Sequence, residues 1–92
     1  MFNSDWKLDG VGTTLTYTSG YHQDINVRNL VGVDVLGVVG VCILGSRASV
    51  GFGVISGTAA TYTISVTVYN STTGAPEPSV NYNIYIYYLR LR

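Results

Sequence analysis

Apolar and hydroxyl side chains alternate residue by residue between Thr61 and Val68. Because successive side chains of a strand point to opposite faces, this two-residue period predicts a β-strand with one buried and one solvated face. The apolar positions, which we expect in the core, are Tyr62, Ile64, Val66 and Val68. The segment 13–19 follows the same pattern, with Leu15 and Tyr17 facing inward.

The final predicted strand, from Val80 to Leu91, is apolar on both of its faces. The inward face would carry Val80, Tyr82, Ile84, Ile86 and Tyr88. The outward face would carry Tyr85, Tyr87, Leu89 and Leu91. A strand that is apolar on both faces needs cover on both faces. We therefore expect the core of the domain against one face and another protein against the other.

The most apolar stretch, 30–44, is longer than a typical strand. Its glycines predict a break near Gly37 or Gly40, because glycine inside a strand marks a bulge, a bend or a close backbone approach. A two-residue period assigns one shared face to Val31, Val33, Val35, Val39, Val41 and Ile43.

Turn-forming residues separate these segments at short intervals, and no segment has the 3.6-residue period of a helix. A strand around Ile25 is expected to include Val27, and another to cover 49–55. Short links between many strands favour antiparallel pairing. We predict an all-β fold, an antiparallel β-sandwich or β-barrel (jelly-roll-like) of about 6–8 strands with essentially no helix.

The chain has 92 residues, which is the size of one small domain. We expect a single β domain over 1–92, with an N-terminal arm at 1–12 and the β-sandwich or β-barrel at 13–92. Charged residues make up 11 % of the chain and the formal net charge is zero, which argues against nucleic acid as a main partner. No signal peptide is recognisable at the start, and 30–44 is too short and too charged to span a membrane.

Candidate catalytic and metal-binding residues are few. The chain has one histidine, His22, and one cysteine, Cys42, whereas a zinc site needs three or four ligands. No serine, histidine and acidic residue form the pattern of a nucleophilic site. Asp34 is flanked by valines, and we expect it to pair with Arg28 or Arg47 or to reach water. We therefore predict no enzymatic activity, no metal and no cofactor.

Tyrosine is the one residue type in clear excess, with eight in the chain. Aromatic side chains offer a large apolar area and are enriched at protein contacts. The candidate interface residues are Trp6, Tyr85, Tyr87, Leu89 and Leu91. Two interpretations of Trp6 remain open: it caps one end of the core, or it docks on a neighbouring subunit. Candidate ligand contacts in the loops are Tyr21, His22, Asn70 and Thr73.

The texture of the sequence resembles small structural proteins of tailed-phage virions. The features that carry the resemblance are the alternating threonine and valine strands, the glycine-rich valine run, the few charges and the last strand, YNIYIYYLRLR. Capsid decoration (cement) proteins and the head domains of tail fibres are both similar. The resemblance implies a β-barrel or sandwich, often trimeric, that sits on other virion proteins.

Two functions follow as expectations. The first is a non-enzymatic capsid decoration protein, made in the host cytoplasm and located in the virion. Its partners would be further copies of the chain, with a trimer favoured, and the major capsid protein or another virion protein. The alternative is a receptor- or carbohydrate-binding head of a tail fibre, in which the loops 20–24 and 70–78 contact a glycan.

Overall fold

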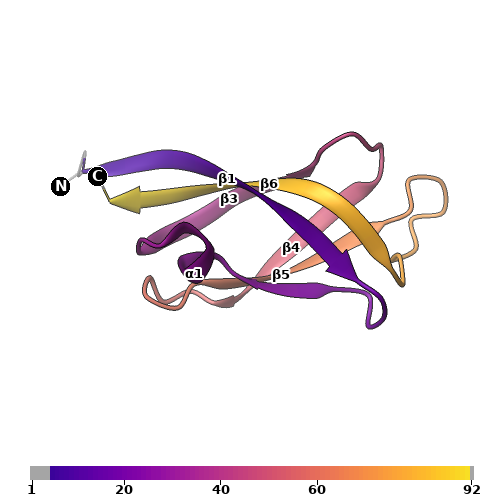
Figure 1. Cartoon of the computed structure of the whole chain (residues 1–92), viewed down its shortest axis with the longest axis horizontal. Coiled ribbons are helices and arrows are strands. Elements are labelled where there is room, and N and C mark those ends of the chain that lie inside the picture. The colour runs from indigo at the N-terminus through magenta and orange to yellow at the C-terminus, as the bar shows by residue number, and fades with distance from the viewer. Residues whose placement is uncertain (1–4, 92) are drawn as a thin grey trace.

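The computed structural model describes residues 5–91, which form six strands and one short helix (Figure 1). The elements are β1 (Trp6–Tyr17), β2 (Gln23–Asn26), α1 (Val27–Val31), β3 (Val35–Ile43), β4 (Ser49–Ser56), β5 (Thr63–Tyr69) and β6 (Val80–Leu91). The strands form two three-stranded antiparallel sheets. We call β1-β6-β3 the first sheet and β2-β5-β4 the second sheet. The predicted all-β sandwich is confirmed.

The core lies between the two sheets and is built largely from alternate residues of the strands, together with Val27 of the helix. Its buried members are Leu15, Tyr17, Ile25, Val27, Val35, Tyr62, Ile64, Val66, Val68, Ile84, Ile86 and Tyr88. The inward positions predicted for the segments around Thr61 and Val80 are therefore confirmed. No polar or charged residue is buried within the part of the chain that the structure describes.

Two tyrosines connect the sheets through their hydroxyl groups. The backbone N–H of Val68 in the second sheet donates to the hydroxyl of Tyr17 in the first, at 3.3 Å. In the opposite direction, the backbone N–H of Val38 donates to the hydroxyl of Tyr62, also at 3.3 Å. The phenols of Tyr17 and Tyr62 thus each have a hydrogen-bond partner, which a buried polar group requires.

The pairing of β3 with β6 shifts register twice, between Val35 and Gly37 and between Val38 and Gly40. The break predicted near Gly37 or Gly40 is confirmed as a pair of β-bulges. Each bulge inserts one residue, so the side chains that face the core follow at three-residue intervals, namely Val35, Val38 and Val41. The single face expected from strict alternation is therefore wrong: Val39 points outward.

The strand expected to continue through Val27 ends instead at Asn26, where the five-residue helix α1 begins. The side chain of Asn26 accepts a hydrogen bond from the backbone N–H of Asn29 at 3.0 Å, which caps the helix. Gly32 ends the helix with a φ of 76°, a conformation that glycine adopts at low cost. From within the helix, the Arg28 guanidinium donates to the carboxylate of Asp34, which follows the helix, at 2.9 Å. Arg28 is therefore the partner of Asp34.

The first strand begins at Trp6 rather than at residue 13, so the expected arm is wrong for 6–12. Those residues pair with the second half of β6, from Trp6 opposite Leu91 to Gly12 opposite Tyr85. The sequence hid this strand because glycines and charges interrupt its alternation. Residues 1–4 of the expected arm lie outside the described residues. The free ends of β1 and β6 lie together at one end of the long axis (Figure 1).

Candidate interaction surface

The outer face of the first sheet collects the candidate interface residues. Residues directly opposite each other in an antiparallel pair point to the same side of the sheet. Trp6 lies opposite Leu91 and Leu8 lies opposite Leu89. Along β6, Tyr85 and Tyr87 share this side because the buried residues between and around them face the core. All five predicted interface residues therefore lie on one face, with Leu8 as an addition.

The bulges of β3 extend this surface. Since the core-facing valines of β3 are three residues apart, two residues in each interval point outward. These are Leu36 with Gly37, and Val39 with Gly40. We define the apolar face as Trp6, Leu8, Leu36, Val39, Tyr85, Tyr87, Leu89 and Leu91. Six of the eight side chains, all except Tyr85 and Leu89, are between 41 % and 57 % exposed.

Sequence reasoning missed Leu8, Leu36 and Val39. Leu8 lies in the segment predicted as an arm, and strict alternation assigns Val39 to the face of Val35. Leu36 lies on the opposite face from Val35 under alternation as well, but the pattern does not show that this face is exposed. The recurring glycines of the segment 35–41, three residues apart, were the available signal. A glycine every third residue fits a strand with two bulges better than a strand with a single break.

The two outward tyrosines of β6 lie over glycines of the neighbouring strands. A Cβ atom on Gly10 would overlap the ring of Tyr85, so this ring lies across β1. Tyr87 is paired directly with Gly10 on one side and with Gly40 on the other. The two rings contact each other edge to face, with centroids 5.1 Å apart and an interplanar angle of 60°. Part of the aromatic surface is thus fixed in place on the sheet.

Among the described residues, the apolar face carries no Asp, Glu, Lys or Arg. The nearest ion pair, between Asp9 and Arg90, lies on the opposite side of the same sheet, with Arg90 Nε 3.1 Å from Asp9 Oδ2. The pKa of Asp9 is lowered by the hydrogen bond from the Gly10 backbone N–H and then by the Arg90 side chain. Burial, together with the charge of Asp9, raises the pKa of Tyr88. The charges of this ion pair therefore lie on the other side of the first sheet, and the apolar face itself carries none.

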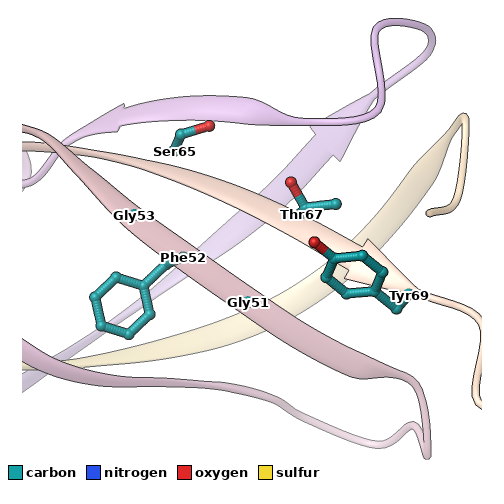
Figure 2. Close-up of a pocket in the computed structure, with 6 residues that line it drawn as sticks. All are labelled: Gly51, Phe52, Gly53, Ser65, Thr67 and Tyr69. Carbon is teal, nitrogen blue, oxygen red and sulfur yellow. The ribbon is translucent and has the colours of Figure 1, made fainter. Parts of the chain in front are cut away.

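The outer face of the second sheet has a different composition. We define the hydroxylated face as Ser49, Gly51, Gly53, Thr63, Ser65, Thr67 and Tyr69, which point away from the core on β4 and β5. It contains an open depression of about 400 Å³ lined by Gly51, Phe52, Gly53, Ser65, Thr67 and Tyr69. Figure 2 shows the hydroxyl groups of Ser65, Thr67 and Tyr69 following one another along β5. The Tyr69 ring lies beside Gly51, where an added Cβ would be 3.3 Å away.

The predicted ligand contacts in the loops lie apart from the apolar face, at the end of the molecule opposite the free ends of β1 and β6 (Figure 1). Tyr21 is exposed and has a positive φ of 66°. His22 places Nδ1 2.8 Å from the Gly20 carbonyl and Nε2 3.6 Å from the Asp24 carboxylate. These contacts organise the turn itself.

The second loop is also internally bonded. The Asn70 side-chain oxygen accepts hydrogen bonds from the backbone N–H groups of Thr72 and Thr73, at 2.8 and 3.0 Å. The Thr73 hydroxyl accepts from the Ala75 N–H at 3.3 Å. The oxygens of Asn70 and Thr73 are therefore already engaged in shaping the loop.

No group of three or more potential metal ligands occurs among residues 5–91. The helix of the described chain is too short to cross a membrane. Comparisons with protein-family models, with curated proteins and with solved structures find no match. The argument about function therefore rests on the geometry of the two outer faces.

Proposed function

We propose that this protein is a non-enzymatic structural subunit of a virion, such as a capsid decoration protein that self-associates and binds the capsid surface. The observation that supports the proposal is the apolar face, whose residues are half-exposed and carry no charge. The six side chains that are 41–57 % exposed leave on the order of 600 Å² in contact with water, taking roughly 200 Å² for one large side chain. The largest apolar patch of an ordinary monomer is about 300–600 Å² and is often functional, so a patch at the upper end of this range favours a role in protein contacts.

The resemblance of the sequence to structural proteins of phage virions is the reason for proposing a role in the virion. Part of the sequence that carries the resemblance to phage structural proteins lies on the two outer faces of the sandwich. The threonine and serine positions form the hydroxylated face, and the last strand supplies half of the apolar face. A small β-sandwich with one polar and one apolar outer face suits a subunit that makes a protein contact through its apolar face and leaves its polar face available to the rest of an assembly.

Quantitative mass spectrometry of purified particles from the source of the sequence tests this proposal. A decoration protein is expected in a copy number comparable to that of the major capsid protein. A tail-fibre head is expected in a few copies per particle. Absence from particles that have been purified to constant composition would overturn the virion assignment.

A second candidate function, a carbohydrate-binding head, is favoured by the depression on the hydroxylated face. Its lining combines three hydroxyl groups with the half-exposed ring of Tyr69, and it contains no charge. Hydroxyl groups exchange hydrogen bonds with sugar hydroxyls, and an aromatic ring offers a surface for the apolar side of a sugar ring. The loop residues expected to contact a glycan have their acceptor oxygens engaged within the loops instead.

A glycan array tests this second candidate with two matched variants. Loss of binding on Tyr69→Ala, with retention on Tyr21→Ala, would assign the site to the depression. The reverse result would assign it to the loops. An array that shows no binding by the unmodified chain would remove the carbohydrate-binding function.

A further inference from the structure

We propose that a second copy of this chain covers the apolar face, so that two first sheets pack face to face about a two-fold axis. The inference deepens the proposed function, on which it rests, by naming the first partner of the subunit. Four properties of the apolar face carry the argument: its area, its relief, its lack of charge and its position relative to the hydroxylated face.

The area matches what a stable pair requires. Full cover would bury on the order of 600 Å² of side-chain surface on each copy, or about 1,200 Å² for the pair, which reaches the lower end of the roughly 1,200–2,000 Å² of a standard interface. Two sheets packed face to face lie ~10 Å apart, a separation that side chains from both faces fill. The apolar face is therefore large enough to form one interface.

The relief of the surface is self-complementary. Leu36 and Val39 project from β3 beside Gly37 and Gly40, which leave gaps. A Cβ on Gly37 would meet no atom within 4 Å, and one on Gly40 would reach a single atom of Tyr87 at 4.0 Å. Projections and gaps that alternate along one strand allow the same surface to receive a copy of itself.

The two ends of the sheet suggest where the axis passes. At one end, Leu91 projects from β6 opposite Trp6. At the other end, a depression of about 350 Å³ is lined by Gly12, Thr13, Thr14, Leu44, Asn83 and Ile84. Tyr87 lies midway between Leu91 and Asn83 along β6. A two-fold axis close to Tyr87 places the projecting end of each copy over the depression of the other.

The charge distribution also favours an identical partner. The apolar face has no side chain with a formal charge, so two copies approach without repulsion. A partner selected by charge would need a complementary charge, and the ion pair of Asp9 and Arg90 points to the other side of the sheet. Recognition on this face therefore depends on shape and apolar area.

A two-fold pair uses the apolar face of both copies, whereas a closed three-fold ring needs two different surfaces on each copy. The hydroxylated face is polar and does not match the apolar face. In the two-fold pair, both hydroxylated faces point outward, where they remain available to the rest of an assembly. The trimer expected from the resemblance would instead require a second apolar surface, which exposed residues of β4 such as Val54 and Ile55 would have to provide.

The test measures the molar mass of the purified full chain by light scattering and sedimentation over a range of concentrations. The unmodified chain is expected at twice the mass of one copy. Val39→Asp places a charge inside the proposed interface and should weaken association at least about 100-fold. Ser49→Asp is the matched control, since Ser49 is an exposed residue on an edge strand of the other sheet, and it should leave association unchanged.

Cross-linking tests the position of the axis. Tyr87→Cys, in a Cys42→Ser background, should give covalent dimers with a bismaleimide that spans about 10 Å, because the two Tyr87 positions face each other across the axis. Ser49→Cys in the same background should give none. Circular dichroism and urea unfolding establish that each variant is folded, and Leu8→Lys replaces Val39→Asp if that variant is not.

Three outcomes overturn the inference: an unmodified chain that stays monomeric at about 1 mM, a stable trimer, or a dimer that dissociates on Ser49→Asp and not on Val39→Asp. These outcomes are separate from failure of the proposed function. A dimer of the purified chain that is absent from virions removes the virion role and leaves the pairing intact. A monomer that is abundant in virions removes the pairing and leaves the role.

Discussion

The two outer faces of this sandwich are built by the same rule and have opposite chemistry. In both sheets the central strand sends alternate residues inward, from Ile64 to Val68 in β5 and from Ile84 to Tyr88 in β6, and these are buried to a similar degree. The outward residues are mostly hydroxylated on β5, whereas on β6 they are aromatic or aliphatic from Tyr85 onward and amides only at Asn81 and Asn83. The inner faces explain why the chain folds, whereas the difference between the outer faces is the basis of the proposed pairing.

The neighbours of the central strands reinforce this difference. The second sheet places Gly51 and Gly53 beside the hydroxyls of β5, so its outer face remains low and polar. In the first sheet the Tyr85 ring lies over Gly10, and the bulges in β3 place Val39 on the outer side together with Leu36. Glycine therefore has a different role on each face. In the second sheet it leaves the hydroxyl groups open to water, and in the first sheet it makes room for the Tyr85 ring.

The largest expected effect separates the inside of β6 from its outside. Ile86 is fully buried and the next residue, Tyr87, is 42 % exposed. Ile86→Ala should lower the free energy of unfolding by about 2–5 kcal/mol, because it removes buried methyl groups and leaves a cavity. Tyr87→Ala should cost about 1 kcal/mol or less in a monomer. Urea unfolding at low protein concentration measures both.

Concentration dependence sharpens this first comparison. Because a partner that binds the folded state stabilises it by mass action, the stability of the unmodified chain should rise with protein concentration. Tyr87→Ala should reduce this rise, whereas Ile86→Ala should lower stability at every concentration. Equal losses for the two variants in dilute solution would mean that the outer face of β6 supports the monomer as strongly as the core does.

A smaller effect compares one glycine from each sheet. Both Gly10 and Gly53 have backbone angles that other residues adopt, but their surroundings differ. An added Cβ on Gly10 would overlap the Tyr85 ring, and one on Gly53 would meet no atom within 4 Å. Gly10→Ala should therefore cost about 1–3 kcal/mol, while Gly53→Ala should be neutral or stabilise the chain by up to ~1 kcal/mol.

A double-mutant cycle checks that the cost of Gly10→Ala comes from the ring. In a Tyr85→Ala background, the added methyl group has room, and the loss should shrink to a few tenths of a kcal/mol. Thermal or urea unfolding of the four chains gives the coupling energy. If Gly10→Ala costs the same in the Tyr85→Ala background, then position 10 needs glycine because of the β1 backbone and not because of a clash with the Tyr85 ring.

Much of the fold could be predicted because alternation is a local property. Tyr62, Ile64, Val66 and Val68 were assigned to the core from the period alone, and strand β5 is regular. Prediction failed where pairing decides the structure instead. Trp6 to Gly12 has little strand character of its own and becomes a strand because β6 offers a long partner edge. The helix that begins at Val27 depends on the Asn26 cap, whereas the alternation of Ile25 and Val27 predicted a continuing strand.

The candidate surface was predicted in part for the same reason. The outward row of β6 follows from alternation, so Tyr85 and Leu89 could be assigned to one face directly. Val39 depends on the bulge between Val35 and Gly37, and a bulge is defined by pairing with a neighbouring strand. A break near Gly37 turns Val39 outward, whereas a break near Gly40 alone leaves it on the face of Val35, so the two predicted positions place Val39 on opposite faces.

The smallest expected effect concerns the ion pair of Asp9 and Arg90, which lies on the side of the first sheet opposite the apolar face. The pKa of Asp9 is lowered from 3.8, first by the Gly10 N–H at 2.9 Å and second by Arg90. Below pH 3.8 the folded chain therefore holds fewer protons at this site than the unfolded chain. The stabilisation is complete above that pH and is lost as the pH falls through the lower, folded pKa.

Arg90→Gln distinguishes the two causes of this shift. The variant loses the weaker cause and keeps the Gly10 hydrogen bond, so the pKa of Asp9 should rise and still remain below 3.8. Carboxyl carbon NMR through an acid titration measures the value, with an unstructured peptide containing Asp9 as the reference. A pKa at or above the reference value in Arg90→Gln would show that the guanidinium dominates. In that case the charge of Arg90, and not the backbone hydrogen bond from Gly10, stabilises the Asp9 carboxylate at the end of the first sheet.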